Sequence, residues 1–117
     1  MIGFPSSLGI HLAVEPQDLR KPFNGLAALA GGIKPAGLEG GCLFAFTNKR
    51  RNRLKILYHD RTGVCIPAKR LETGTFSWPK SATSQAASVS PTPEALQLLF
   101  DGIDLRAATM RPWYQRD

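Results

Sequence analysis

The first apolar pattern in the chain is a strand-like alternation near the N-terminus. Aliphatic side chains occupy every second position of residues 7–14, namely Leu8, Ile10, Leu12 and Val14. This spacing places them on one face of a β-strand. His11 falls on the other face, so we expect a half-exposed strand residue rather than a metal ligand or a catalytic base. Pro16 then ends the strand.

The apolar period next changes to three and four, which predicts a helix. The residues at this spacing are Leu19, Phe23, Leu26, Ala27, Leu29 and Ala30. They are typical of an amphipathic helix of about three turns. We expect Asp18 to be its N-cap and Pro22 to lie in or just before its first turn. The pair Gly31 and Gly32 is expected to stop this helix.

Three short apolar runs follow, and they predict a three-stranded meander over residues 42–47, 54–59 and 64–68. The connection between the first two runs is nearly all charged, and we expect it to project from the sheet. We expect Phe44 to oppose Leu57. Phe46 then opposes Lys55. Both faces of this unit are largely apolar, which predicts a helix or a loop over each, and Pro67 marks an edge strand or its end.

The composition shifts to Ser, Ala and Pro after residue 79. Residues 80–92 therefore read as a flexible linker. Thr92 followed by Pro93 then predicts a helix start, with a Thr cap and Pro at the first position. An apolar stripe marks this helix at Leu96, Leu99 and Phe100, and Gly102 ends it.

Together these elements predict an α+β fold. It comprises a small antiparallel sheet, built of a three-stranded meander plus an N-terminal strand, with one N-terminal amphipathic helix and a short C-terminal helix. Residues 8–79 are expected to form a single domain that carries the basic hairpin. Residues 80–92 are the linker, and residues 93–117 are the C-terminal helix and tail.

Bulk composition favours a soluble, cytoplasmic protein. The chain has 117 residues, of which 43% are hydrophobic and 21% charged, as in globular domains. No apolar run reaches the roughly 20 residues that cross a bilayer. The N-terminus lacks the basic start and long apolar stretch of a secretion signal. We expect no membrane partner.

The positive charge is concentrated in one third of the chain. Residues 48–80 hold nine Lys or Arg and two acidic residues, whereas the rest hold six and seven, so this segment carries the whole net charge of +6. Such clustering predicts a polyanion partner, most often nucleic acid. Acidic proteins, membranes and plain solvation remain alternatives. The candidate binding residues are Lys49, Arg50, Arg51, Arg53, Lys55, Lys69 and Arg70.

Other side chains with potential chemistry have structural interpretations. Cys42 and Cys65 lack metal-ligand spacing, and on the outer strands of a meander they would lie beyond disulfide reach. We expect two reduced thiols, no metal and no cofactor. Phe76 is expected in the core, whereas Trp78 fits either the core or a stacking surface beside Lys69 and Arg70.

Several segments match the motifs of a known family. Residues 18–26 match D-M-R-K…G-L, 44–58 match F-x-F-x-N-R/K-R-x-D/N-R-I/L-K-x-L-x, 60–63 match D-x-x-G, 69–79 match K-R-L-E-x-G-x-F-x-W-P, and 99–104 match L-x-x-G-I-D. On these residues the chain resembles the small TnpB-type accessory protein, the second open reading frame product, of the insertion-sequence family numbered sixty-six. The resemblance covers residues 8 to 104.

The resemblance implies an accessory role in transposition, beside a separate transposase that performs strand transfer. Three departures are Leu19 in place of Met, His59 in place of Trp, and a less aromatic segment at 65–68. The leading hypothesis is non-catalytic DNA binding through the basic hairpin. The alternative is a protein-interaction module that docks on the transposase or on another accessory subunit of the same element.

Catalysis is the third hypothesis, because three carboxylates lie inside the family motifs. Asp18, Asp60 and Glu72 could together hold Mg²⁺ for phosphoryl transfer. Their structural interpretations are stronger: a helix cap, a turn start and a partner for a nearby base. No set of Ser, His and Asp or of Cys and His suggests a nucleophile. We therefore expect no enzyme activity.

Overall fold

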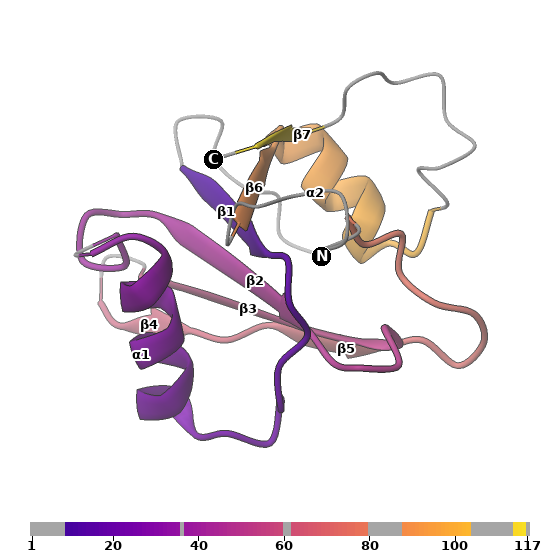
Figure 1. The fold of residues 1–117 in the computed structure, drawn as a ribbon, viewed down its shortest axis with the longest axis horizontal. Coiled ribbons are helices and arrows are strands. Elements are labelled where there is room, and N and C mark those ends of the chain that lie inside the picture. Colours follow the sequence, from indigo (N-terminus) through magenta and orange to yellow (C-terminus); the bar gives the residue numbers. More distant parts are fainter. Residues whose placement is uncertain (1–8, 36, 60–61, 80–87, 104–113, 117) are drawn as a thin grey trace.

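The fold is a β-sheet with one helix packed on each face (Figure 1). The computed structural model describes residues 9–35, 37–59, 62–79, 88–103 and 114–116. The elements are β1 (Ile10–Ala13), α1 (Phe23–Ile33), β2 (Leu43–Thr47), β3 (Arg53–His59), β4 (Val64–Cys65), β5 (Ala68–Arg70), β6 (Ser88–Pro91), α2 (Pro93–Phe100) and β7 (Tyr114–Arg116). Within these ranges seven strands form one sheet in the order β4-β3-β2-β1-β6-β7, and β5 also pairs with β3.

The sheet is mixed, so the predicted antiparallel sheet is wrong at β1. This strand pairs in parallel with β2, and Ile10 lies opposite Leu43. The physical reason is the connection between them: α1 crosses one face of the sheet, and the chain re-enters it in the same direction. The N-terminal strand is thus a central strand with a partner on each side, not an addition to a meander.

Central placement also buries β1 on both faces. All four of its residues are buried, and His11 is only 9% exposed rather than half-exposed as predicted. Its imidazole stacks on the ring of Phe44, with centroids 5.5 Å apart. Alternation in the sequence reports two faces, but it does not report that both faces are covered.

Helix α1 begins and ends later than the sequence predicts. Pro22, not Asp18, is its N-cap, with no side-chain hydrogen bond to the first turn. The helix continues through Gly31 and Gly32 to Ile33, because glycine permits a left-handed stop but does not impose one. It buries Leu26 and Ala30 against the sheet, and its other apolar residues are partly buried or exposed.

The register of the hairpin β2–β3 confirms the prediction. Phe44 pairs with Leu57, and Phe46 pairs with Lys55. The expected cover over both faces is confirmed as well. On one face α1 packs on a cluster that contains Phe44, Phe46 and Leu57. On the other, α2 packs on the cluster of Leu43, Ala45, Leu54 and Ile56.

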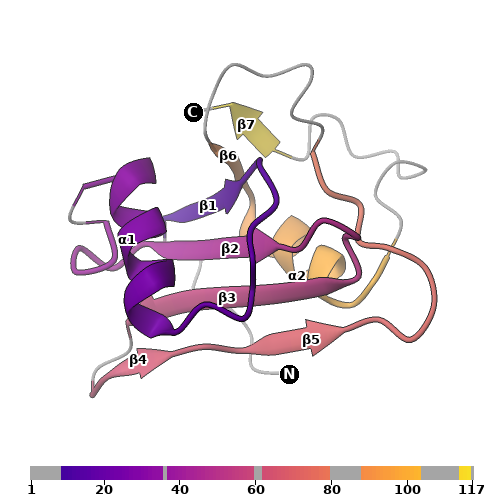
Figure 2. The same cartoon turned by 60° about the horizontal axis from the view of Figure 1, so that its bottom comes forward.

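The expected strand at residues 64–68 is two shorter strands along one edge of the sheet. Figure 2 shows β4 and β5 following one another beside β3. The break contains Pro67, which has no N–H to donate to the ladder. Its carbonyl still accepts a hydrogen bond from the N–H of Ile56 at 2.9 Å. The edge position predicted from Pro67 is confirmed.

The predicted linker at 80–92 contains a strand. Its residues 88–91 form β6, which pairs with β1 so that Leu12 lies opposite Val89, and with β7 on its other side. Val89 is fully buried. Residues 80–87 lie outside the described residues. A Ser- and Pro-rich composition suggested flexibility, but residues 88–91 lie in the sheet, where they pair with β1 and bury Val89.

The start and end of α2 follow the prediction closely. The hydroxyl of Thr92 accepts a hydrogen bond from the N–H of Ala95 at 3.1 Å, and Pro93 occupies the first turn. Gly102 follows the helix with a φ of +82°, a conformation that favours glycine. The apolar stripe is buried in the core. No helix in the described part of the chain is both long and apolar enough to span a bilayer.

Candidate nucleic-acid interface

Two asparagines organise the basic loop between β2 and β3. The Asn48 carboxamide oxygen accepts hydrogen bonds from the backbone N–H groups of Asn52 at 3.1 Å and Arg53 at 3.0 Å. Its amide group donates to the Asn52 side chain at 2.8 Å. Arg51 closes the loop with a φ of +58°, the left-handed conformation that non-glycine residues rarely adopt. The loop is therefore a closed turn of defined shape.

The segment that follows β5 braces this loop. The N–H of Leu71 donates to the carbonyl of Asn52 at 2.8 Å, and the N–H of Phe76 donates to the carbonyl of Arg51 at 2.7 Å. The prediction that the loop projects from the sheet is therefore wrong. Residues 71–76 pack beside it and hold its backbone on the body of the protein.

Replacing Asn48 with Ala is expected to destabilise the fold by about 1–3 kcal/mol, because two backbone N–H groups lose their acceptor. Urea unfolding followed by circular dichroism measures this change. Asn24→Ala is the matched control, because Asn24 is exposed on α1 and should shift stability by no more than about 0.5 kcal/mol. Equal effects of the two substitutions would show that Asn48 does not hold the loop.

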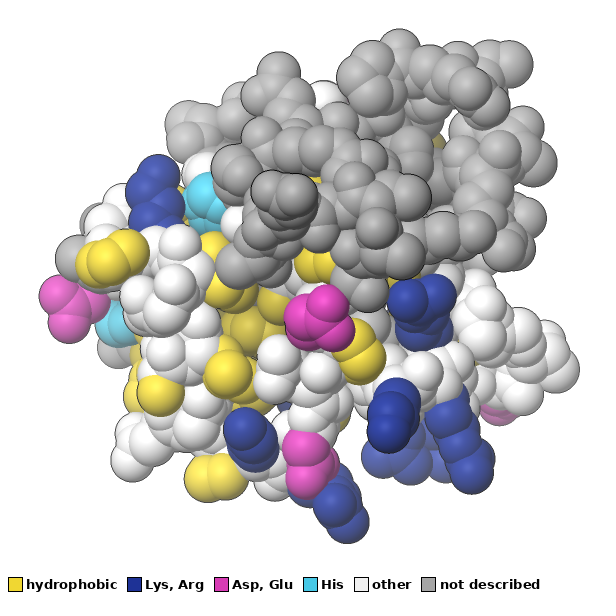
Figure 3. Space-filling view, viewed as in Figure 1, with side chains coloured by type: hydrophobic (Ala, Val, Ile, Leu, Met, Phe, Trp, Pro, Cys, Tyr) yellow, Lys and Arg dark blue, Asp and Glu magenta, His cyan; other side chains and the backbone are white. Residues whose placement is uncertain are grey.

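Two arginines face each other across neighbouring strands beside the loop. Arg53 on β3 lies opposite Arg70 on β5, and both side chains are exposed. Like charges directly opposite in a sheet are destabilising. Figure 3 shows Lys and Arg side chains gathered at the end of the molecule where this loop and β5 lie.

An open hollow of about 570 Å³ collects these charges, and we refer to it as the basic hollow. Its charged lining is Arg20, Lys49, Arg50, Arg53, Arg70 and Asp18. Four of the seven predicted residues thus line one site. A smaller hollow of about 440 Å³ adjoins it and shares Arg20, Arg53 and Arg70. The predicted residues Lys55 and Lys69 also line this second hollow.

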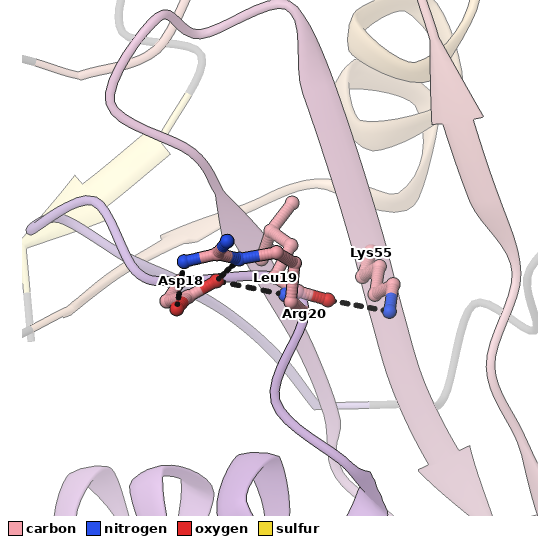
Figure 4. Close-up of polar contacts among 4 residues, drawn as sticks. All are labelled: Asp18, Leu19, Arg20 and Lys55. Atoms are coloured by element: carbon pink, nitrogen blue, oxygen red, sulfur yellow. Dashed lines mark hydrogen bonds and ion pairs between the residues drawn. The ribbon is translucent and has the colours of Figure 1, made fainter.

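Arg20 is a member of this site that the charge count missed, since it lies outside residues 48–80. Figure 4 shows its guanidinium paired with the Asp18 carboxylate, from Nε to Oδ1 and from the terminal nitrogen to Oδ2, both at 3.0 Å. The N–H of Arg20 also donates to Oδ1 at 3.0 Å. The spacing of two residues in Asp-x-Arg before a helix was the available signal, because Asp commonly accepts from the backbone two residues on. Asp18 thus orients Arg20 instead of capping α1.

The Asp18 carboxyl is expected to titrate at unusually low pH. Hydrogen bonds from the Arg20 side chain, and then from its backbone N–H, lower the pKa of Asp18 from 3.8 to about 2. The same pairing raises the pKa of Arg20. Because the lowered pKa belongs to the folded state, the stabilising contribution is complete above pH 3.8 and is lost as the pH falls toward 2.

Carbon-13 NMR of the Asp18 carboxyl measures this titration. Arg20→Gln should move the midpoint back toward 3.8, and Lys34→Gln, remote from the pair, should leave it near 2. A wild-type midpoint near 3.8, in a protein whose amide spectrum is still that of the folded state, would contradict the pairing.

The other three predicted residues do not line the basic hollow. The Lys55 ammonium donates to the carbonyl of Leu19 at 2.6 Å, which ties β3 to the segment before α1 (Figure 4). Lys69 points to the opposite face of the sheet, where its ammonium lies 5.4 Å from the centroid of the Phe100 ring. Arg51 is half-buried at the turn of the loop.

The aromatic residues near the basic segment belong to the core. Phe76 is 2% exposed, which confirms its predicted place, and Trp78 is 5% exposed. The indole N–H of Trp78 donates to the carbonyl of Ala13 at 2.8 Å, so both its ring and its polar atom are occupied. The open choice for Trp78 is thereby decided in favour of the core.

Carboxylates and thiols form no cluster in the residues that the structure describes. Within them no three His, Cys, Asp or Glu side chains could jointly hold a metal ion. Asp18 is paired with Arg20, Glu72 is exposed after β5, and Asp60 lies outside the described residues. Neither Cys42 nor Cys65 forms a disulfide.

Comparisons with known proteins identify the relatives of this chain. A family model described as IS66 Orf2 like protein matches residues 8–110. Two proteins of Sinorhizobium fredii (strain NBRC 101917 / NGR234) are similar over nearly the full length. The uncharacterized protein y4jC is 35% identical over 96% of this chain and 93% of its own, and the uncharacterized protein y4hO is 32% identical over 96% of each. No solved structure matches the chain.

Proposed function

Because this chain belongs to the IS66 Orf2-like family, and so is a transposition-associated accessory protein, we propose that it binds DNA without catalysis through the basic hollow. The family implies the process, transposition, and the basic hollow suggests the partner, DNA. Its lining carries five cationic side chains and one carboxylate, and that carboxylate is already paired with Arg20.

The observation that carries the proposal is the Arg53–Arg70 pair. These residues lie directly opposite each other on β3 and β5. In the absence of a ligand the arrangement costs stability, because like charges at this separation repel. An anion between the two guanidinium groups removes that cost and receives planar, multidentate hydrogen bonds from both. DNA phosphates are anions of this kind, and they are repeated along the strand.

The proposal predicts a strong salt dependence of DNA affinity. Neutralising about four phosphates gives a slope near −3.6 when log K is plotted against log salt concentration. Fluorescence anisotropy with a labelled duplex, over several salt concentrations, measures the slope. Binding that is absent at low salt, or that does not change with salt, would contradict DNA binding by this site. Lys34→Gln, which removes a charge outside the basic hollow, should leave the slope unchanged.

The alternative is that the same side chains dock on an acidic surface of the transposase or of another accessory subunit. Arginine forks bind carboxylates as readily as phosphates, so the site itself fits both. Co-purification with the partner before and after nuclease treatment separates the two. Retention after nuclease, together with absent DNA binding, would favour the protein partner.

A further inference from the structure

We propose that the ligand of the basic hollow is the sugar–phosphate backbone of double-stranded DNA, contacted without base stacking and without sequence readout. This inference rests on the proposed function and names its substrate class. Three features of the described residues carry it: the lining of the hollow, the bracing of its loop, and the set backbone positions of its cations.

The lining offers no stacking platform. No aromatic side chain lines the basic hollow or the adjoining one, as far as the described residues extend. Of the aromatics near the lining residues in sequence, Phe46, Phe76 and Trp78 are buried. Phe23 is 36% exposed on α1, but it lines neither hollow. Single-strand binding proteins depend on aromatic stacking, which is worth about 1–3 kcal/mol per base. This site lacks that source of affinity.

The loop cannot reach far into a DNA groove. A β-ribbon that reads bases must project into the major groove, so that its side chains meet the base edges. Here hydrogen bonds from Leu71 and Phe76 hold the loop backbone against residues 71–76. Strand β3 is paired with β5 from its first residue, Arg53, directly after the loop. Arg50 and Arg53 therefore present their charges from the surface of the protein. Contacts of this kind position a protein on DNA but carry no sequence information.

The backbone positions that carry the cations are also set before any ligand arrives. Asp18 orients Arg20, the Asn48–Asn52 pair shapes the loop, and strand pairing sets Arg53 beside Arg70. An array of cations with set backbone positions favours a ligand whose phosphates already have fixed spacing, because a flexible single strand loses conformational entropy on binding. Without stacking, nothing in this lining offsets that loss. A duplex supplies both fixed spacing and a higher charge density.

Anisotropy titrations with two unrelated duplexes, and with their separate strands, test the inference. About 20 base pairs suffice, since the longest dimension of the protein, 37 Å, spans about 11 base pairs. At equal salt we expect both duplexes to bind at least about fivefold more tightly than the single strands, and to differ from each other by no more than about twofold. The double variant Arg53→Gln/Arg70→Gln should weaken both duplexes by the same factor, whereas Lys34→Gln should weaken neither.

Each of the other possible results contradicts one part of the inference: the duplex preference, the absence of sequence readout, or DNA binding itself. Single strands that bind as tightly as the duplexes refute the duplex preference but leave DNA binding intact. A preference of about tenfold for one duplex sequence refutes the absence of sequence readout. If no DNA binds at low salt, the proposed function fails, and this inference fails with it.

Discussion

Replacing both Arg53 and Arg70 with Gln is expected to weaken DNA binding by about ten- to a hundredfold near 0.1 M salt, because two phosphate contacts are lost. The salt slope should become shallower by about 2. The stability of the fold should not decrease. Removing two like charges that oppose each other on β3 and β5 should leave stability unchanged or raise it by a few tenths of a kcal/mol.

This combination distinguishes a binding site from a structural one. Residues kept for the fold lower stability when replaced, whereas residues kept for a ligand often do the opposite. Anisotropy titration and urea unfolding of the same protein preparation give both values. Lys34→Gln is the matched control, with one exposed charge removed outside the basic hollow. A double variant that binds DNA as the wild type does would show that the pair is not a phosphate site.

Replacing Trp78 with Ala is expected to destabilise the protein by about 3–5 kcal/mol, the usual cost of removing a large buried aromatic side chain. The indole ring is 5% exposed and packs in the core between the sheet and α2. Its N–H is bonded to the carbonyl of Ala13, so the substitution also leaves that buried acceptor without its partner. For a domain with a typical stability of about 5–15 kcal/mol, this loss is a large fraction of the total.

Urea unfolding followed by far-ultraviolet circular dichroism measures this loss. Trp78→Phe keeps most of the apolar volume and should cost less than Trp78→Ala. Phe23→Ala is the control, since Phe23 is 36% exposed and should shift stability by less than about 1 kcal/mol. A fully stable Trp78→Ala protein that loses only DNA binding would instead indicate that Trp78 stacks on a base.

Locally determined features were predictable from the sequence. The hairpin register is set locally by its turn, in which Asn48 accepts hydrogen bonds from the N–H groups of Asn52 and Arg53. The start of α2 follows from Thr92 and Pro93, whose hydroxyl acceptor and fixed φ act within one turn. Apolar residues on both faces of β2 required cover on both sides, and α1 and α2 supply it.

Features that depend on distant partners were not predictable in the same way. The parallel pairing of β1 with β2 depends on the path of α1, and the strand at residues 88–91 depends on the open edge of β1. In isolation the Ser- and Pro-rich segment carries no strand signal. Its hydrogen bonds form only because another strand of the folded protein offers a complementary edge.

The residues of the candidate site also include some that the sequence predicts and some that only the fold brings together. By itself the sequence located the excess charge, and with it Lys49, Arg50, Arg53 and Arg70, because net charge over a segment does not depend on the fold. Only the tertiary structure decided which charges share a surface. Strand alternation takes the Lys69 ammonium to Phe100 on the opposite face, and a backbone carbonyl holds the Lys55 ammonium, so these residues line only the adjoining hollow. The approach to α1 brings Arg20 into the basic hollow from outside the basic segment. The side to which a charge points is set by pairing and packing, which a count along the chain does not record.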